Sequence, residues 1–512
     1  MDRSNKVALV RGPILSKKDA VNNEATPSLA FAYISGHLQK HGYNSIIVDA
    51  IGEGLNRTWP SKKYPGFKCQ GLKFKEIIDR IPSDINIIGF SAMFSGEWPI
   101  LRDLIIQTRS SFPNVLIVIG GEHATALTEY SLRDCPAIDI CIRGEGEQIL
   151  VDVLNVHNQN GSYDKVEGAA YIDENGEYHQ KTYKPVRMNN INAIPWPLWP
   201  KGYLEKFWEA GKSFGISSKR DMPFMISRGC PFKCTFCSNK LMWGVRYNLR
   251  DIDDIIDEIK HYVQIYNISS IQLYDLTAIT KRNWTIKFCE RLIAEDIQLD
   301  WSFPSGTRSE ALDKEALSYL KKIGCKYLVY APESGSVQTL KKIKKQINLN
   351  DITNSAIEAK RQGLIIRTNL IIGFPGETWR DVFRTILYGI KLAIKGVDEV
   401  PIFIFSPYPG TELFDELQRE GKIVLNENYF LSLTSLNSSY FNINVISHNP
   451  KLNAKKLGIT RVFAILLNYL LGYLIYPKRI FRTFRKLQNL ESASTVFEHR
   501  IIDLLKSMLL AK

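Results

Sequence analysis

The sequence predicts an α/β protein that contains two parallel-sheet domains and ends in a helical region. Residues 6–150 alternate short apolar runs, rich in Val and Ile, with helical patterns, and residues 223–422 repeat one strand–helix unit six times. Parallel neighbours need a crossover segment, usually a helix, so this alternation predicts parallel sheets. The pattern changes beyond residue 430, where long apolar and basic stretches predict helices.

Composition sets the outer limits of the prediction. With 512 residues, 45% of them apolar and 23% charged, the chain has the size and mix of a globular protein of several domains, which excludes a disordered or collagen-like chain. Eight cysteines, three of them in one tight cluster, predict a reducing compartment rather than a disulfide framework. The net charge of +13 favours an anionic partner such as acidic lipid, phosphate or nucleic acid. The first residues carry no long apolar segment, so no secretory signal is expected.

The N-terminal part is expected to be a Rossmann-like, doubly wound domain. Its predicted strands are residues 6–12, 45–50, 85–93, 115–123 and 139–147, and its clearest helices are residues 28–43 and 99–112. Ligands of such sheets bind beyond the carboxyl ends of the strands, which here carry the sequences FSAMF, GGEHAT and RGEGE. The alternative is that the glycines of these segments only form tight turns.

The second sheet is expected to be a partial (β/α)6 barrel. Its strands are predicted at FMISRG, SIQLYD, DWSFPSG, KYLVYAPESG, LIIRTNLIIGFPG and EVPIFIFSPYPG. Six units are fewer than a closed eight-stranded barrel needs, so one side is expected to stay open. The carboxyl ends of barrel strands carry the chemistry, and these strands end in polar, Gly or Pro residues.

Four domains follow from these patterns. They are residues 1–150, a doubly wound domain; 151–222, an extension with two short strands around DENGEY and a linker; 223–430, the partial barrel; and 431–512, a helical domain. The linker is expected at residues 191–208, where dense Pro and Trp resist both helix and sheet.

The C-terminal domain contains an uncharged run, residues 462–476, followed directly by a stretch with five basic and no acidic residues, 477–486. The run is short for a bilayer-spanning helix. One interpretation is a membrane-surface segment with its basic residues against anionic lipid. The alternative is a core helix that packs on the barrel and has a basic exposed side.

Three cysteines carry the strongest chemical signal. Cys230, Cys234 and Cys237 form a C-x-x-x-C-x-x-C pattern in the loop after the first barrel strand. Three thiolates on one loop suit an iron–sulfur cluster or zinc. A structural zinc site requires four ligands, and no fourth Cys or His lies near in sequence. A four-iron cluster held by three cysteines leaves one iron open to another ligand.

Together with this pattern, Arg228, Gly229, Pro231 and Phe236 resemble the radical S-adenosylmethionine (SAM) superfamily, as do Trp243-Gly244, Glu333-Ser334-Gly335, Gly373–Thr378 and Tyr408–Thr411. The resemblance implies that the open iron binds SAM and that an electron from the cluster cleaves SAM to a 5′-deoxyadenosyl radical. It implies these cofactor-binding residues: Phe236, Asp275, Arg308, Glu333, Ser334, Gly373 and Pro375. Relatives often carry paired aspartates where this chain has Tyr274-Asp275, which makes the role of Asp275 less defined.

The order of a Rossmann-like domain, a linker and a barrel resembles the cobalamin-binding radical SAM subfamily. The matching residues include Ser91, Gly120, Gly121, Glu122, His123 and Gly144, which the resemblance implies to be cobalamin-binding. The D-x-H-x-x-G motif of other corrinoid proteins is absent, so cobalamin is expected to be held without a histidine ligand to cobalt. The alternative is a vestigial domain that binds no cofactor.

These features predict a cobalamin-dependent radical SAM enzyme that methylates an unreactive carbon of a small molecule, and the membrane-surface interpretation predicts an apolar one. Alternatives are a radical cyclase or oxidase of the porphyrin-ester type, and a corrinoid or iron–sulfur sensor without catalysis. The predicted cofactors are a [4Fe-4S] cluster, SAM and cobalamin. The predicted partners are a flavodoxin- or ferredoxin-like electron donor and a membrane surface, with a cytoplasmic location, peripheral at the inner face of the membrane. No nucleic-acid partner is expected, since the basic residues are interspersed along helices.

Overall fold

A computed structural model describes residues 6–18, 20, 25–182, 184–212, 220–434, 442–489, 493–498, 501, 502 and 505. The chain divides into two compact units, each assembled from three segments. Unit 1 comprises 1–207, 235–248 and 407–435, and unit 2 comprises 208–234, 249–406 and 436–512. The boundaries of the four predicted domains stay predictions beside this division.

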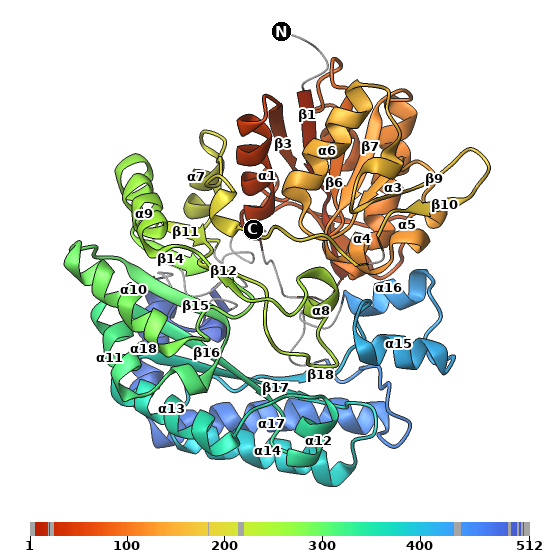
Figure 1. Cartoon of the computed structure of the whole chain (residues 1–512). Coiled ribbons are helices and arrows are strands. Elements are labelled where there is room, and N and C mark those ends of the chain that lie inside the picture. The colour runs from red at the N-terminus through yellow and green to blue at the C-terminus, as the bar shows by residue number, and fades with distance from the viewer. Residues whose placement is uncertain are drawn as a thin grey trace. The chain divides into compact units, whose positions relative to one another are not determined.

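Unit 1 is built on a seven-stranded sheet of order β10-β9-β8-β7-β6-β1-β3 (Figure 1). Its strands are β1 (Lys6–Arg11), β3 (Asn44–Asp49), β6 (Ile87–Ser91), β7 (Leu116–Gly120), β8 (Ile140–Ile142), β9 (Ala169–Ile172) and β10 (Tyr178–Gln180). The first five pair in parallel, and β9 and β10 add an antiparallel edge. The five predicted strands and the two short strands around DENGEY are thereby confirmed.

The parallel strands of unit 1 run in the order β3-β1-β6-β7-β8, so the chain reverses direction across the sheet between β1 and β6. Such a switch point opens a crevice at the carboxyl edge, where doubly wound sheets bind ligands. The helices of unit 1 are α1 (Leu29–Lys40), α2 (Phe74–Ile78), α3 (Trp98–Ser111), α4 (Glu122–Ala126), α5 (Thr128–Asp134), α6 (Gly146–Asn158), α7 (Tyr203–Glu209), α8 (Asn239–Met242), α15 (Glu412–Arg419) and α16 (Glu427–Leu433).

Two elements of unit 1 differ from the sequence-based expectation. A small sheet of order β2-β5-β4 was not predicted; its strands are β2 (Ile14–Lys17), β4 (Thr58–Pro60) and β5 (Phe67–Gln70). The expected linker contains helix α7, although its Pro and Trp content predicted neither helix nor sheet. Tertiary packing decides this helix, because Tyr203 and Phe207 are buried and the Tyr203 hydroxyl donates to Asp49 Oδ2 at 2.7 Å.

Unit 2 is an open sheet of six parallel strands in sequential order, β11-β14-β15-β16-β17-β18. The strands are β11 (Asp221–Phe224), β14 (Ser270–Leu273), β15 (Asp300–Thr307), β16 (Cys325–Glu333), β17 (Ile365–Ile372) and β18 (Ile402–Ile404). Helices between them are α9 (Ile252–Tyr266), α10 (Arg282–Ala294), α11 (Lys314–Lys322), α12 (Val337–Lys342), α13 (Leu349–Arg361) and α14 (Trp379–Ile394). This arrangement confirms the predicted partial (β/α)6 barrel.

The first barrel strand is displaced from its predicted position. FMISRG was expected to form it, whereas β11 ends at Phe224 and a separate two-stranded sheet joins β12 (Ser227–Arg228) to β13 (Asn248–Leu249). Pro223 is tolerated in β11 because β11 is an edge strand, where a missing backbone donor is harmless.

The C-terminal region contains α17 (Ala454–Ile475) and α18 (Lys478–Asn489), which confirms the predicted helical character. The apolar run at 462–476 was expected to be short, but α17 starts eight residues earlier. With 22 residues it is long and apolar enough to cross a membrane by length and composition. One third of its most apolar window is buried inside the protein. Helix α17 packs alongside α14, on the outside of the barrel (Figure 1).

Gly324, between α11 and β16, provides a test of how closely two backbone segments of unit 2 approach each other. It has φ +93°, and a Cβ there would lie 2.3 Å from the Leu299 carbonyl oxygen. Gly363 has a similar φ of +80° but meets nothing closer than Lys321 Nζ at 3.9 Å. We expect Gly324→Ala to lower the thermal midpoint of unit 2 by about 5 °C more than Gly363→Ala, since the backbone collision adds roughly 1–3 kcal/mol to the shared positive-φ strain. Equal midpoints for the two variants would contradict this packing.

Candidate functional site

The cysteine loop begins directly after β12, where Gly229 has φ +87°. Cys230 and Cys234 are partly exposed, and Cys237 is exposed. Thr277 contributes a hydroxyl 3.7 Å from Cys230 Sγ. Burial raises the pKa of Cys234, and the nearby Lys345 ammonium opposes that shift. Phe236 and Cys237 belong to the segment that groups with unit 1.

The other cysteines of the chain have a different environment. Burial raises the pKa of the Cys69, Cys135, Cys141 and Cys325 thiols to about 12. It also raises the pKa of the Cys289 thiol. Accessible thiols are therefore concentrated in the loop, and their chemistry suits iron–sulfur ligation. Over the described residues, no three His, Cys, Asp or Glu side chains are already gathered as a metal site. The three sulfurs would have to draw together around a cluster.

Asp275 follows β14 and supports the segment that leads into the cysteine loop. It is fully buried and accepts hydrogen bonds from the Ile226 backbone N–H at 3.2 Å and from the Ser227 hydroxyl. Burial raises its pKa to about 6 despite these bonds. A single aspartate thus ties the end of one barrel strand to the entrance of the loop, which gives it a positioning role.

Glu333, the last residue of β16, is the most unusual residue of this edge. It has φ +64°, a left-handed conformation that disfavours a residue with a Cβ. Its carboxylate pairs with Lys345 Nζ at 3.0 Å, and the two side chains are 10% and 13% exposed. Burial lowers the pKa of Lys345, but the Glu333 charge outweighs it and the net shift is upward. A strained, charged residue at the carboxyl edge of a barrel is typical of a ligand site.

Arg308 and Ser334 lie at neighbouring strand ends. The Arg308 guanidinium stacks 3.7 Å from the ring centroid of Phe232, a residue of the cysteine loop, and donates to Glu310 Oε1 at 2.8 Å. Ser334 is fully buried and bonded to the Thr385 hydroxyl at 2.9 Å. Arg308 therefore contacts the loop itself, whereas Ser334 supports the turn after Glu333.

The segment Gly373–Thr378 forms a rigid turn after β17. Glu377 accepts the backbone N–H groups of Gly373 at 2.7 Å and Phe374 at 3.0 Å, and burial raises its pKa to about 7. Asn449 donates to the carbonyl oxygens of Phe374 and Glu377 from the C-terminal region. Pro375 is partly exposed at the tip of this turn.

In unit 1, the predicted glycines shape the carboxyl edge of the sheet. Ser91 pairs with Gly120, and a Cβ on Gly121, with φ +122°, would lie 2.7 Å from the Ala92 carbonyl oxygen. After β6 and the buried Ala92, Met93 and Phe94 are exposed by 36% and 59%. The switch-point edge therefore presents apolar side chains on a closely packed backbone.

His123 is buried and fully engaged. Its Nδ1 lies 2.9 Å from the Ser95 hydroxyl, its Nε2 3.3 Å from the Ser131 hydroxyl, and its ring stacks on Trp98. Burial lowers its pKa to about 3, so the ring is neutral. Glu122 accepts a hydrogen bond from Ser238, and burial raises its pKa. Both residues hold the turn together, and neither is aimed outward as a ligand.

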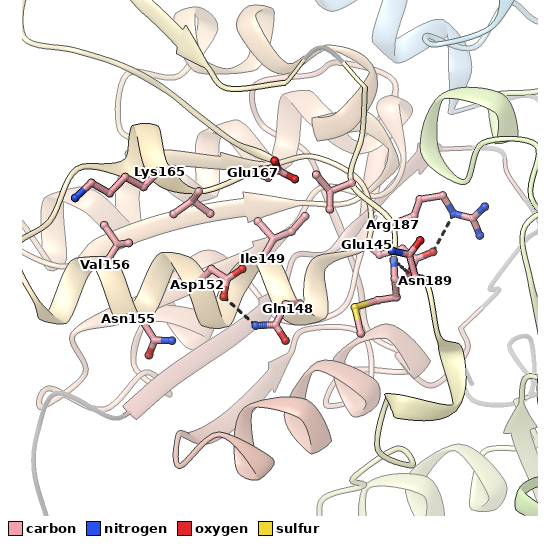
Figure 2. A pocket seen from close by; sticks show the side chains of 13 residues that line it. Glu145, Gln148, Ile149, Asp152, Asn155, Val156, Lys165, Glu167, Arg187 and Asn189 are labelled. Carbon is pink, nitrogen blue, oxygen red and sulfur yellow. Dashed lines mark hydrogen bonds and ion pairs between the residues drawn. The ribbon is translucent and has the colours of Figure 1, made fainter.

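Gly144, with φ +95°, makes a close approach to a neighbouring segment, since a Cβ there would lie 2.3 Å from the Val186 carbonyl oxygen. Beside it lies a cavity of about 570 Å³, lined by α6 and the segments 165–167 and 186–189 (Figure 2). Glu145 bonds Arg187 at 3.2 Å there, and Gln148 bonds Asp152 at 2.8 Å. The cavity contains none of the predicted site residues.

Three residues of these edges were missed by sequence reasoning: Lys345, Phe232 and Asn449. Lys345 belongs to a lysine-rich segment, 341–345, that runs past the end of α12 and has the sequence pattern of a solvated surface. The positive φ of Lys344 turns the chain so that Lys345 reaches Glu333. Phe232 could have been suspected from its place between two cysteines, whereas Asn449 carries no local signal.

Comparison with known proteins connects these two edges with two families. Residues 224–388 match the radical SAM superfamily model, and residues 20–154 match the B12 binding domain model. Two solved structures share the fold across 99% of this chain. They are the radical SAM methyltransferase TsrM of Kitasatospora setae (TM-score 0.65, 13% identity, 99% of that chain) and the cobalamin-dependent radical SAM enzyme OxsB (TM-score 0.66, 16% identity, 79% of that chain).

Relatives in sequence cover most of the chain. The uncharacterized methyltransferase PH0819 of Pyrococcus horikoshii is 28% identical over 80% of this chain and 82% of its own length. Cytidylyl-2-hydroxyethylphosphonate methyltransferase of Streptomyces wedmorensis is 26% identical over 79% of this chain and 80% of its own. Anaerobic magnesium-protoporphyrin IX monomethyl ester cyclase of Rubrivivax gelatinosus is 26% identical over 79% of this chain and 68% of its own length.

An α/β protein with a B12-binding sheet and a partial barrel that bears three loop cysteines defines the class of cobalamin-binding radical SAM enzymes. The chain belongs to the radical SAM superfamily, in the group that also carries a B12-binding domain. It is a radical SAM enzyme, and a [4Fe-4S] cluster, SAM and cobalamin are the cofactors of its domains. The predicted family, fold class and cofactor set are confirmed, while the individual site residues stay predictions.

The loop cysteines give the first test of the site. We expect anaerobically reconstituted enzyme to lose its iron–sulfur absorbance and its SAM cleavage when Cys230, Cys234 and Cys237 are all replaced by alanine. The matched control replaces Cys69, Cys135 and Cys141, which are buried in unit 1, and should keep both signals. Iron retained by the loop variant, or stoichiometric zinc bound by the wild type, would contradict the assignment.

The Glu333–Lys345 pair gives the second test. We expect Lys345→Gln to lower the free energy of unfolding by about 1–3 kcal/mol, because it leaves a carboxylate buried without its partner. Adding Glu333→Gln should recover part of that loss while SAM affinity, measured by calorimetry, stays reduced. The control Lys341→Gln removes an exposed lysine of α12, four residues before Lys345, and should change stability by less than about 0.5 kcal/mol. Equal effects of Lys341→Gln and Lys345→Gln would show that the pair has no structural role.

Proposed function

We propose that this enzyme transfers a methyl group to an unreactive carbon of a small molecule. The observation that carries the proposal is the presence, in one chain, of a three-cysteine loop at the edge of a partial barrel and a B12-binding sheet with an apolar carboxyl edge. Two relatives that cover about four fifths of the chain are named methyltransferases, which supports this choice.

Cys230, Cys234 and Cys237 would hold the cluster, and the residues at the strand ends of unit 2 would position SAM. The cluster and SAM supply a hydrogen-abstracting radical, and cobalamin supplies the methyl group. Glu333 can accept hydrogen bonds from ribose hydroxyls or the SAM ammonium, while its ion pair with Lys345 holds the carboxylate in place. Arg308 would fix the cysteine loop through Phe232, and Gly373 and Pro375 offer a backbone edge to the adenine.

In unit 1, the edge after β6 and β7 would receive the cobalamin. Met93 and Phe94 provide apolar contact for a flat macrocycle, and Gly120 and Gly121 keep the adjacent backbone free of side chains. His123 has both ring nitrogens bonded to serine hydroxyls and is neutral, which agrees with a cobalt that lacks a histidine ligand. Its role would be to hold the loop in shape.

A second candidate is radical ring closure on a porphyrin ester. It is favoured by the similarity to anaerobic magnesium-protoporphyrin IX monomethyl ester cyclase, which has 26% identity over 79% of this chain. The two candidates share their cofactors and differ in whether a methyl group enters the product. A catalytically inactive sensor does not fit, since the chain is a radical SAM enzyme.

The proposed surroundings of the enzyme follow from the sequence. We place it in the cytoplasm, where a flavodoxin- or ferredoxin-like protein would reduce the cluster, and at the inner face of a membrane. A small apolar substrate suits this position. No nucleic-acid partner is proposed.

The decisive experiment supplies anaerobically reconstituted enzyme with cobalamin, a reductant and SAM labelled in its methyl group. We expect 5′-deoxyadenosine to form, and label to enter apolar metabolites extracted from the native host. Cobalt(II) in the loaded protein should show no nitrogen splitting in its paramagnetic resonance spectrum, since cobalamin is expected to be held without a histidine ligand.

Two results would redirect the proposal. Formation of 5′-deoxyadenosine with an unlabelled, oxidised product would favour the cyclase candidate. Failure to retain any corrinoid would rule out methyl transfer through unit 1. Asp296→Asn, which changes an exposed carboxylate in the turn after α10, serves as a control and should retain both activities.

A further inference from the structure

Exposed apolar side chains are concentrated on three helices of unit 2. Twelve of the 28 large apolar side chains that are exposed among the described residues lie on α14, α17 and α18. They are Phe383, Leu387 and Ile394 on α14; Ile459, Phe463, Leu466, Leu470, Leu474 and Ile475 on α17; and Ile480, Phe481 and Phe484 on α18. We call this surface the three-helix face. Such a concentration exceeds the scattered apolar residues of an ordinary protein surface and indicates an interaction site.

The stripe on α17 follows helical periodicity. Residues 459, 463, 466, 470 and 474 are separated by three or four positions, so their side chains lie on one side of the helix. They are between 48% and 66% exposed. Helix α17 packs against α14 and contacts α18, so the exposed stripes of the three helices are neighbours.

The opposite side of α17 is fixed to the barrel by polar contacts. Arg461 is 5% exposed and donates to the Asn442 carbonyl oxygen, and Asn468 is 4% exposed and donates to the Val400 carbonyl oxygen at 3.2 Å. A helix that crossed a bilayer would have to break these contacts and place Arg461 in hydrocarbon, which is expensive. The inner side of α17 therefore packs on the barrel, as the core-helix alternative expects, and its outer side carries exposed apolar side chains.

The exposed charges on α14, α17 and α18 have one sign. Residues 454–489 contain eight Lys or Arg and no Asp or Glu. Lys455, Lys478 and Arg485 are exposed one turn from apolar residues of the same stripes, and Lys391 on α14 is four residues after Leu387. The only acidic residue of α14 is Asp381, which is buried.

Two basic residues of this region are not part of the face. Arg479 is 7% exposed, and its guanidinium donates to the carbonyl oxygens of Gly396 and Val397. Arg482 pairs with Glu498 and Asp398. The sequence grouped both with the lipid-facing cations, and the structure corrects this, because they hold α18 to the barrel.

We propose that the three-helix face docks the enzyme on an anionic bilayer surface, with α17 lying in the plane of the headgroups. An apolar stripe bordered by cations and lacking carboxylates is complementary to such a surface, whereas a second copy of the same face would bring like charges together. The proposal deepens the proposed function by naming where an apolar substrate is collected, and it rests on that function only for this purpose.

The test measures binding of the full-length enzyme to vesicles by sedimentation. We expect binding to vesicles of phosphatidylglycerol and phosphatidylcholine that weakens in high salt, and little binding to phosphatidylcholine alone. Replacing Lys391, Lys455 and Lys478 by glutamine, one lysine from each helix, should weaken binding at least tenfold. The control replaces Lys62, Lys184 and Lys201, exposed lysines of unit 1, removes the same charge, and should bind like the wild type.

A second variant separates lipid docking from self-association. Phe463→Gln with Leu470→Gln changes two exposed side chains, so the fold should persist, and vesicle binding should be lost. Sedimentation equilibrium should give the wild type and this variant the same oligomeric state, because the face does not mediate self-association. A dimer that the variant abolishes, absence of vesicle binding, or an equal loss in the unit 1 control would each overturn the proposal. Because the readout is binding rather than turnover, its failure leaves the proposed radical chemistry intact.

Discussion

Parallel strand pairing is the constraint on which the functional edges of both units depend. Parallel neighbours require a crossover, so every strand of such a sheet ends at the same edge. In unit 2 this places the turns after β14, β15, β16 and β17 together, and each of them contributes a candidate cofactor contact. In unit 1 the same rule brings the ends of β6 and β7 side by side. Residues far apart in sequence thereby become neighbours without any specific interaction between them.

The candidate residues fall into two physical groups. Asp275, Ser334, Glu377 and His123 are buried and have hydrogen-bond partners, so their effect is to fix loops in shape. The cysteines of the loop and the apolar residues after β6 remain accessible, so they can contact a cofactor. Glu333 belongs to both groups, because it is paired with Lys345 and yet held in a strained backbone conformation at the strand end. Preorganisation of this kind positions groups before a cofactor or substrate binds.

The outer side of the barrel shows how one helix can satisfy two surroundings. Helix α17 buries Arg461 and Asn468 against the barrel and exposes a continuous apolar stripe on its other side. The average hydropathy of α17 cannot distinguish a core helix, a spanning helix and a surface helix, because an average does not depend on which side of the helix each residue lies. The placement of its few polar side chains decides among them.

The sequence by itself determined the α/β class, the six-unit barrel and the cysteine loop, because hydrophobic periodicity and ligand spacing are local properties of the chain. It also predicted the strand-end glycines, several of which have positive φ values or close backbone contacts. Only the tertiary structure revealed the Glu333–Lys345 pair, the helix within the Pro- and Trp-rich segment, and the division of basic residues into Arg479 and Arg482, which face inward, and Lys478 and Arg485, which are exposed. Each of these depends on which distant segment packs against a residue, and no local pattern contains that information.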